Sequence, residues 1–133
     1  MISVLRELES KSTCLSRRVG CLILSSDGSV LSKGYNNHYK GISCKDTGLC
    51  LRSGSKSGEN LDKCKIVHAE IDAIEKCYNI EKAHTIIITA SPCINCIAEL
   101  LKTNIKNIHF YDEYPHSLSK DLWVNSGRKW RKL

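Results

Sequence analysis

Residues 85–111 read TIIITASPCINCIAELLKTNIKNIHFY and place three structural elements in a row. Thr85 to Ala90 is an uncharged run rich in β-branched residues, which is typical of a buried strand. A serine and a proline end this run, and Cys93 to Leu101 then favours a helix, followed by a strand from Ile108 to Tyr111. A strand, a helix and a strand in this order predict two parallel strands joined by a crossover helix.

The remaining sequence extends this pattern on both sides. Upstream we expect a helix over residues 1–12 and a hairpin of strands Val19 to Leu24 and Ser29 to Tyr35. A second helix is expected from His68 to Tyr78, and its apolar stripe consists of Ile71, Ile74 and Tyr78. Downstream we expect a helix over residues 115–126 and a short edge strand from Lys129 to Leu133. Residues 36–66 form a long predicted loop. This alternation predicts an α/β sandwich in one domain over residues 1–133.

Composition excludes several classes of protein. The chain has 133 residues, of which 41% are hydrophobic and 26% charged, so neither a disordered tail nor a membrane protein is expected. Residues 1–12 contain Glu7 and Glu9 and no apolar core, and they do not resemble a signal peptide. We therefore expect a reducing, cytoplasmic location. The formal charge of +6 suits either a polyanion or a small anionic substrate.

The eight cysteines need an explanation other than disulfides, because a chain of this length can bury its own core and a reducing compartment keeps thiols free. Two short motifs carry the chemistry: His68-Ala69-Glu70 and Pro92-Cys93-Ile94-Asn95-Cys96. A spacing of three residues places both sulfurs on one face of a helix, and the histidine opens another helix. One His and two Cys make three ligands, which is the number that a catalytic zinc uses when the fourth position holds water.

Glu70 lies two residues from the histidine, close enough to move protons without binding the metal. The order H-x-E followed by P-C-x-x-C is the known signature of zinc nucleobase deaminases. The chain resembles the deoxycytidylate (dCMP) deaminases of the cytidine deaminase superfamily, and the resemblance extends over nearly the whole length. It rests on these two motifs and on Arg18–Cys21, Gly34–Asn36, Ile105–Ile108 and Arg128–Leu133.

The resemblance implies a three-layer α/β/α sandwich around a mixed five-stranded sheet, and hydrolytic deamination of dCMP to dUMP. It also implies roles for individual residues. Asn36 would hold the deoxyribose hydroxyl, the Ala69 amide would bind the pyrimidine carbonyl, and the Ser91 carbonyl would accept the departing amine, with Pro92 beside them. Departures from the usual family pattern occur at Asn37, His38, Tyr39 and Asp72.

Candidates for contact with a phosphate or a regulatory nucleotide are basic or aromatic residues expected near the pocket mouth: Arg17, Arg18, His38, Lys40, Tyr111 and Tyr114. Solvated charge or ordinary packing is the alternative for each of them. The closing run from Arg128 to Lys132 is expected to be a solvated edge rather than a nucleic-acid patch.

Four cysteines remain near or within the long loop: Cys14, Cys44, Cys50 and Cys64. Relatives carry a structural zinc in this region, and four thiolates would make a closed tetrahedral site, so we expect a second Zn²⁺ here. The alternative is free thiols. Cys21 and Cys77 are expected to be small buried apolar residues.

By the same resemblance we expect a homo-oligomer, a hexamer, that is activated by dCTP and inhibited by dTTP, with Mg²⁺ accompanying the triphosphate. Two other enzyme activities stay open: deamination of dCTP as well as dCMP, and deamination of a base in RNA. A different class, a non-catalytic zinc module that binds nucleic acid through its positive charge, would give Glu70 no purpose. Neither nucleic acid nor a membrane is an expected partner.

Overall fold

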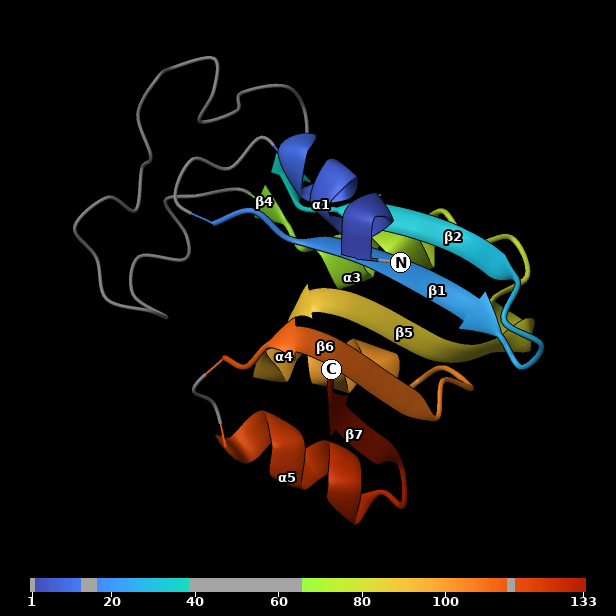
Figure 1. Ribbon diagram of the computed structural model, residues 1–133. Coiled ribbons are helices and arrows are strands. Elements are labelled where there is room, and N and C mark those ends of the chain that lie inside the picture. The colour runs from blue at the N-terminus through green and yellow to red at the C-terminus, as the bar shows by residue number, and fades with distance from the viewer. Residues whose placement is uncertain (1, 13–16, 39–65, 115–116) are drawn as a thin grey trace.

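The computed structural model describes residues 2–12, 17–38, 66–114 and 117–133 (Figure 1). Its central sheet has five strands in the order β2-β1-β5-β6-β7. Their bounds are Gly20–Ser25 for β1, Val30–Tyr35 for β2, Ala83–Ala90 for β5, Asn107–Asp112 for β6 and Lys129–Lys132 for β7. Strand β1 is antiparallel to β2 and β5, whereas β5, β6 and β7 are parallel. The expected mixed sheet and its parallel crossover are confirmed.

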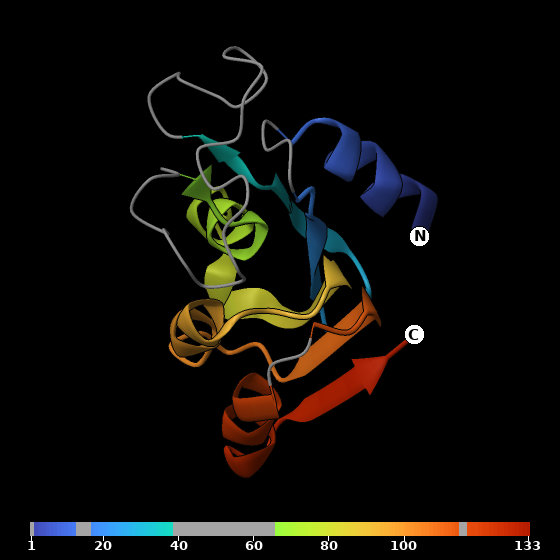
Figure 2. The same cartoon turned by 90° about the vertical axis from the view of Figure 1, so that its left-hand side faces the viewer.

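Helices cover the sheet unequally on its two faces (Figure 2). Helix α1 (Ile2–Ser10) lies on one face, and α3 (Ala69–Glu75), α4 (Ile94–Leu100) and α5 (Ser117–Asn125) lie on the other. A short 3₁₀ helix, η3 (Ile80–Lys82), leads into β5. The described elements therefore form the three layers expected from the sequence. No helix in these described ranges is both long enough and apolar enough to cross a membrane.

Strands β1 and β5, two of the three inner strands, supply apolar side chains to both faces, which explains their hydrophobic runs. In β1, Cys21 and Ile23 belong to the core beneath α3 and α4, whereas Leu22 and Leu24 pack with Leu5 of α1. Strand β5 divides in the same way, because successive side chains of a strand point to opposite faces. Cys21 and Cys77 are buried, as predicted.

The helix predicted from His68 to Tyr78 is shorter in the structure and ends at Glu75. The placement of Tyr78 on an apolar stripe is wrong, because its side chain is fully exposed. The amide of Cys77 donates to the carbonyl of Ile74 in a tighter final turn, after which η3 returns the chain to β5. A two-residue ladder of β3 (Asn37–His38) and β4 (Ile66–Val67) was also not expected from the sequence.

Arg128 departs from the expectation of a solvated edge. Its guanidinium donates to the carbonyls of Leu100, Leu101 and Ile105 at distances of 3.2, 3.1 and 2.9 Å. The first two contacts bind carbonyls at the C-terminal end of α4, which have no partners within the helix, and the third binds the segment that leads to β6. Arg128 therefore anchors the helix whose other end carries the cysteine motif.

Helix α3 rests directly on β2 at Gly34. A β-carbon at this position would lie 2.7 Å from the Ala73 amide nitrogen and 2.8 Å from the Ala73 β-carbon, and it would also clash with the carbonyl oxygen of Ala69. We expect Gly34→Ala to lower the free energy of unfolding by about 3 kcal/mol, because rigid backbone must move to admit the methyl group. Urea unfolding measures this, with Lys33→Ala, an exposed site on the same strand, as the control. Equal midpoints for the two variants would show that α3 is not tightly seated.

Candidate metal centre and active site

Two helix starts bring the chemistry-bearing residues together. His68 is the N-cap of α3 and Cys93 is the N-cap of α4, and both have extended backbone (φ −66°, ψ 151° and φ −75°, ψ 169°). Strand β5 ends at Ala90, so Ser91 and Pro92 lead directly from the sheet to Cys93. Side chains at these positions can project beyond the helix start, and Cys96 follows one turn later on α4.

The three expected ligands converge. The ligand atoms of His68, Cys93 and Cys96 all lie within 4.8 Å of one another. Nδ1 of His68 is 3.6 Å from the Cys93 sulfur and 3.4 Å from the Cys96 sulfur, which identifies the ring nitrogen that faces both thiols. In a tetrahedral zinc site, a nitrogen ligand and a sulfur ligand stand about 3.6 Å apart. The two distances from the His68 nitrogen therefore match those of a zinc site, and the donor set of one nitrogen and two sulfurs suits zinc.

Glu70 is only 4% exposed, and its carboxyl lies close enough to interact with His68 and with both cysteines of the cluster. Burial raises the pKa of its carboxyl, and the positive charge of His68 partly offsets this rise. A raised pKa makes the carboxyl a better proton carrier near neutral pH, because it can both accept and return a proton. The burial and raised pKa of Glu70 are compatible with a proton carrier, and its catalytic role stays a prediction.

The thiols of the cluster differ in their affinity for protons. The pKa of Cys93 is lowered to about 3, first by a hydrogen bond from Cys96 and further by one from His68. The same hydrogen bond and burial raise the pKa of Cys96. The hydrogen bond with Cys93 raises the pKa of His68. A lowered pKa favours the thiolate form of Cys93, which is the form that binds zinc.

The structure describes the surroundings of Ala69 and Asn36, two of the predicted substrate contacts. Ala69 is the first residue of α3, so its amide has no acceptor within the helix and is available to a carbonyl oxygen. Asn36 is buried and both ends of its side chain are engaged: Oδ1 accepts from the Val19 amide at 2.9 Å, and Nδ2 donates to the Arg17 carbonyl at 2.7 Å. An amide group has a second proton and a second lone pair, so Asn36 retains capacity for a ligand.

Two hydrogen bonds hold Ser91 against the end of β6 and the segment that follows it. The Ser91 amide donates to the carbonyl of Asp112 at 2.9 Å, and the Ser91 hydroxyl accepts from the Tyr114 amide at 2.6 Å. The guanidinium carbon of Arg17 lies 3.3 Å from the centre of the Tyr114 ring. Arg17 and Tyr114 therefore link the segment before β1 with the segment after β6.

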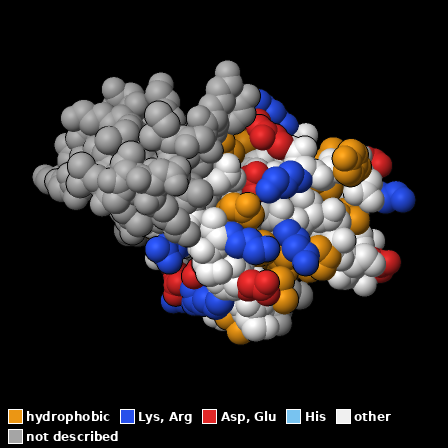
Figure 3. Space-filling view, turned by 90° about the horizontal axis from the view of Figure 1, so that it is seen from above, with side chains coloured by type: hydrophobic (Ala, Val, Ile, Leu, Met, Phe, Trp, Pro, Cys, Tyr) orange, Lys and Arg blue, Asp and Glu red, His pale blue; other side chains and the backbone are white. Residues whose placement is uncertain are grey.

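Other predicted contacts are placed elsewhere or lie outside the described residues. Tyr111 packs against the apolar cluster beneath α1, and Arg18 is exposed. His38 lies in β3, and its side chain is not described. Lys40 and the four cysteines predicted to bind a structural zinc, Cys14, Cys44, Cys50 and Cys64, lie outside the described ranges. On the face shown in Figure 3, basic side chains are interspersed with acidic and apolar ones rather than gathered into one patch.

Sequence reasoning missed three buried polar contacts, two of which join helix α3 to the sheet and one of which joins β1 to β5. The Cys21 thiol donates to the Ala69 carbonyl at 3.1 Å, and the Thr89 hydroxyl accepts from the Gly20 amide at 3.1 Å. The Ser32 hydroxyl donates to the Ala73 carbonyl at 2.7 Å. Each contact joins residues more than forty positions apart, and no motif or local pattern signals such a pairing.

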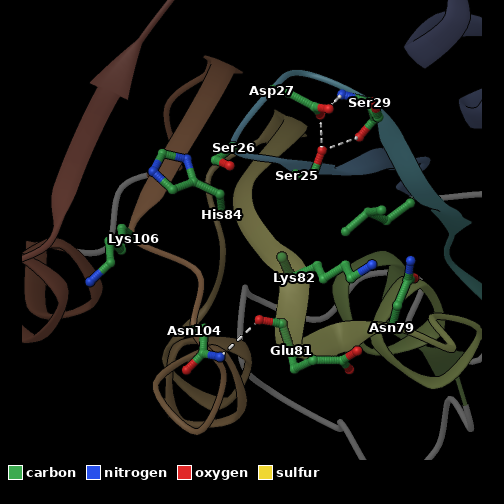
Figure 4. A pocket seen from close by; sticks show the side chains of 12 residues that line it. Ser25, Ser26, Asp27, Ser29, Asn79, Glu81, Lys82, His84, Asn104 and Lys106 are labelled. Carbon is green, nitrogen blue, oxygen red and sulfur yellow. Dashed lines mark hydrogen bonds between the residues drawn. The ribbon is translucent and has the colours of Figure 1, made fainter.

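A pocket of about 710 Å³ lies at the opposite end of the sheet, where the β1–β2 turn, the start of β5 and the approach to β6 meet. Figure 4 shows that Lys82 and Lys106, which line it, extend away from each other. Asp27 is engaged by the Ser25 hydroxyl and by the Ser29 amide. The pocket is therefore separate from the metal cluster and does not gather its positive charges around one point.

A family model described as the cytidine and deoxycytidylate deaminase zinc-binding region matches residues 1–112. The chain belongs to this family. This membership agrees with the His68, Cys93 and Cys96 cluster, whose donor set fits zinc. The resemblance inferred from the two motifs is confirmed.

Two fungal relatives are longer proteins than this chain. The deoxycytidylate deaminase of Schizosaccharomyces pombe is 30% identical over 108 residues, which cover 78% of this deaminase-family chain and 33% of the relative. The deoxycytidylate deaminase of Saccharomyces cerevisiae is 28% identical over 107 residues, covering 79% and 34%. The chain thus spans about a third of the length of these curated relatives.

The fold of this family member also matches solved structures. The dCMP deaminase from the cyanophage S-TIM5, in complex with dCMP and dUMP, superimposes with a TM-score of 0.75 at 22% identity. The match covers 99% of this chain and 93% of the phage chain. A bacterial cytidine deaminase, from Burkholderia pseudomallei, matches with a TM-score of 0.51 at 14% identity. The expected cytidine deaminase-like fold is confirmed.

Proposed function

We propose that this chain catalyses the hydrolytic deamination of dCMP, in which water adds at C4 of the base and ammonia leaves, giving dUMP. The observation that carries this proposal is the convergence of three zinc-type ligands close to a buried glutamate whose pKa is raised. The choice of dCMP is supported by the names of the fungal relatives and by the nucleotides bound to the phage enzyme.

His68, Cys93 and Cys96 would hold the zinc ion. When bound, zinc lowers the pKa of a water molecule towards ~7, which makes a nucleophile available near neutral pH. The Glu70 carboxylate accepts a proton from the attacking water. It delivers this proton to N3 of the base. It then takes the second proton of the same water from the hydroxyl group added at C4 and passes it to the leaving amino nitrogen, so that ammonia departs and one carboxyl serves as both base and acid.

The remaining contacts orient the substrate. The Ala69 amide donates to the pyrimidine carbonyl, the Ser91 carbonyl accepts from the departing amine beside Pro92, and Asn36 binds the deoxyribose hydroxyl. Backbone groups at a helix start and a strand end are rigid, so they need little reorganisation during the reaction. Arg17, next to Tyr114, is the described candidate for the nucleotide phosphate, because a guanidinium matches phosphate geometry.

Regulation and assembly are parts of the same proposal. We propose dCTP as activator and dTTP as inhibitor, a hexamer as the working form, and Mg²⁺ with the bound triphosphate. The predicted second zinc, on the four loop cysteines, would hold the long loop near the active site. The family resemblance noted in the sequence supports these features.

A substrate panel tests the function directly. We expect the zinc-loaded protein to release ammonia from dCMP at a rate at least about 100-fold above that for deoxycytidine, because loss of the phosphate removes a charge-assisted contact. Cytidine, CMP and dCTP complete the panel, each with and without dCTP or dTTP as effector. Equal rates on dCMP and dCTP would indicate the bifunctional alternative, and turnover of an RNA base alone would contradict the proposal.

A further inference from the structure

We propose that Asp72 is a positioning residue, which sets the place of Asn36 relative to helix α3 through the backbone amide of Tyr35. The inference rests on the proposed function, because Asn36 is the residue assigned to the deoxyribose hydroxyl.

Asp72 is a buried carboxylate with two partners. It is only 6% exposed, and its Oδ2 accepts from the Tyr35 amide at 3.2 Å and from the Lys76 ammonium at 2.8 Å. Among the described residues, strand β2 is at the edge of the sheet, so its outer backbone groups have no neighbouring strand there. The Asn36 amide donates inward to the Val19 carbonyl, and in an antiparallel ladder the preceding amide points the other way. Asp72 satisfies this outward amide.

The bond lies next to the residue that would read the sugar. Asn36 follows Tyr35 directly, and the two ends of its side chain bind the backbone at Val19 and Arg17. The other polar contacts beneath α3, from Cys21 and Ser32, reach the backbone of the helix. The Asp72 contact runs from a helix side chain to the strand, and it therefore links Glu70, two residues earlier on α3, to Asn36.

The ion pair between Asp72 and Lys76 can be tested separately from the hydrogen bond between Asp72 and the Tyr35 amide. The side chain of Lys76 is 50% exposed, and an exposed ammonium adds little to such a pair. Asp72→Asn keeps an oxygen that can accept from the Tyr35 amide but removes the charge. Lys76→Met removes the ion pair and leaves the acceptor in place. If the acceptor is what matters, neither of these variants will reproduce the effect of Asp72→Ala.

The test uses zinc-loaded protein and two substrates, dCMP and 2′,3′-dideoxycytidine 5′-monophosphate, which lacks the sugar hydroxyl. We expect Asp72→Ala to raise KM for dCMP about tenfold with kcat nearly unchanged, because a misplaced Asn36 weakens ground-state binding. On the dideoxy substrate the same variant should change KM less than about twofold, since the contact is absent there. Asp72→Asn, Lys76→Met and the exposed control Glu75→Gln should behave as wild type.

A second readout separates positioning from damage to the metal centre. The visible spectrum of cobalt-substituted protein should be the same in wild type and in each Asp72 variant. If Asp72→Ala fails to fold, Asp72→Leu, which has a similar size and no acceptor, replaces it. Equal losses on both substrates, or an Asp72→Asn variant as impaired as Asp72→Ala, would overturn the inference alone. A wild-type protein that deaminates neither substrate would overturn the proposed function as well.

Discussion

Glu70→Gln is expected to reduce the turnover of dCMP by about 10³-fold while leaving the fold and the zinc content unchanged. The amide has the same shape as the carboxyl, but it cannot take a proton from water or return one to the base. The variant should bind dCMP with near-normal affinity, because the orienting contacts are made by other residues. Steady-state ammonia release, equilibrium binding of dCMP and metal analysis of the same preparation check this expectation.

The stability of this variant provides an internal control. Burial raises the pKa of Glu70 in the folded chain, so the ionised carboxyl destabilises the fold as pH rises above the pKa of the unfolded chain. In metal-free protein at neutral pH, Glu70→Gln should therefore melt at the same temperature as wild type or a higher one. Glu75→Gln, at an exposed position on the same helix, should change neither activity nor melting. Normal turnover in Glu70→Gln would remove Glu70 from the mechanism.

Metal content is expected to separate the cysteines into three groups. Wild-type protein should contain two zinc ions per chain, and Cys96→Ser should lose one of them together with about 10³-fold or more of its activity, because a catalytic site needs all three protein ligands. Cys50→Ser should lose the other zinc. Cys77→Ser, at a buried position outside both predicted sites, should keep both zinc ions.

The pattern of loss decides between the two zinc predictions. One zinc ion in the wild type, absent from Cys96→Ser and retained by Cys50→Ser, would show that the loop cysteines bind none. Zinc retained at the wild-type level by Cys96→Ser would contradict the catalytic cluster itself, whose ligand atoms lie within 4.8 Å of one another. Elemental analysis of dialysed protein gives these numbers directly.

Local sequence was enough for the strands and helices that carry the motifs. The run from Thr85 to Ala90 is apolar on both faces, and this predicted a buried inner strand that the structure extends to Ala83–Ala90. Sequence was less reliable where an element ends. Tyr78 continues the apolar spacing of α3, yet the helix stops before it, because the chain must turn through η3 to enter β5.

Motif order alone determined which residues form the metal cluster, because His68, Cys93 and Cys96 stand at helix starts that any strand–helix alternation would place at one end of the sheet. Only the tertiary structure decided what surrounds them. It identified Nδ1 as the histidine nitrogen that faces the thiols, it raised the pKa of Glu70 by burying it, and it joined Asp72 to the edge of β2. Burial and contacts between distant residues arise from packing of the whole chain, which no local pattern records.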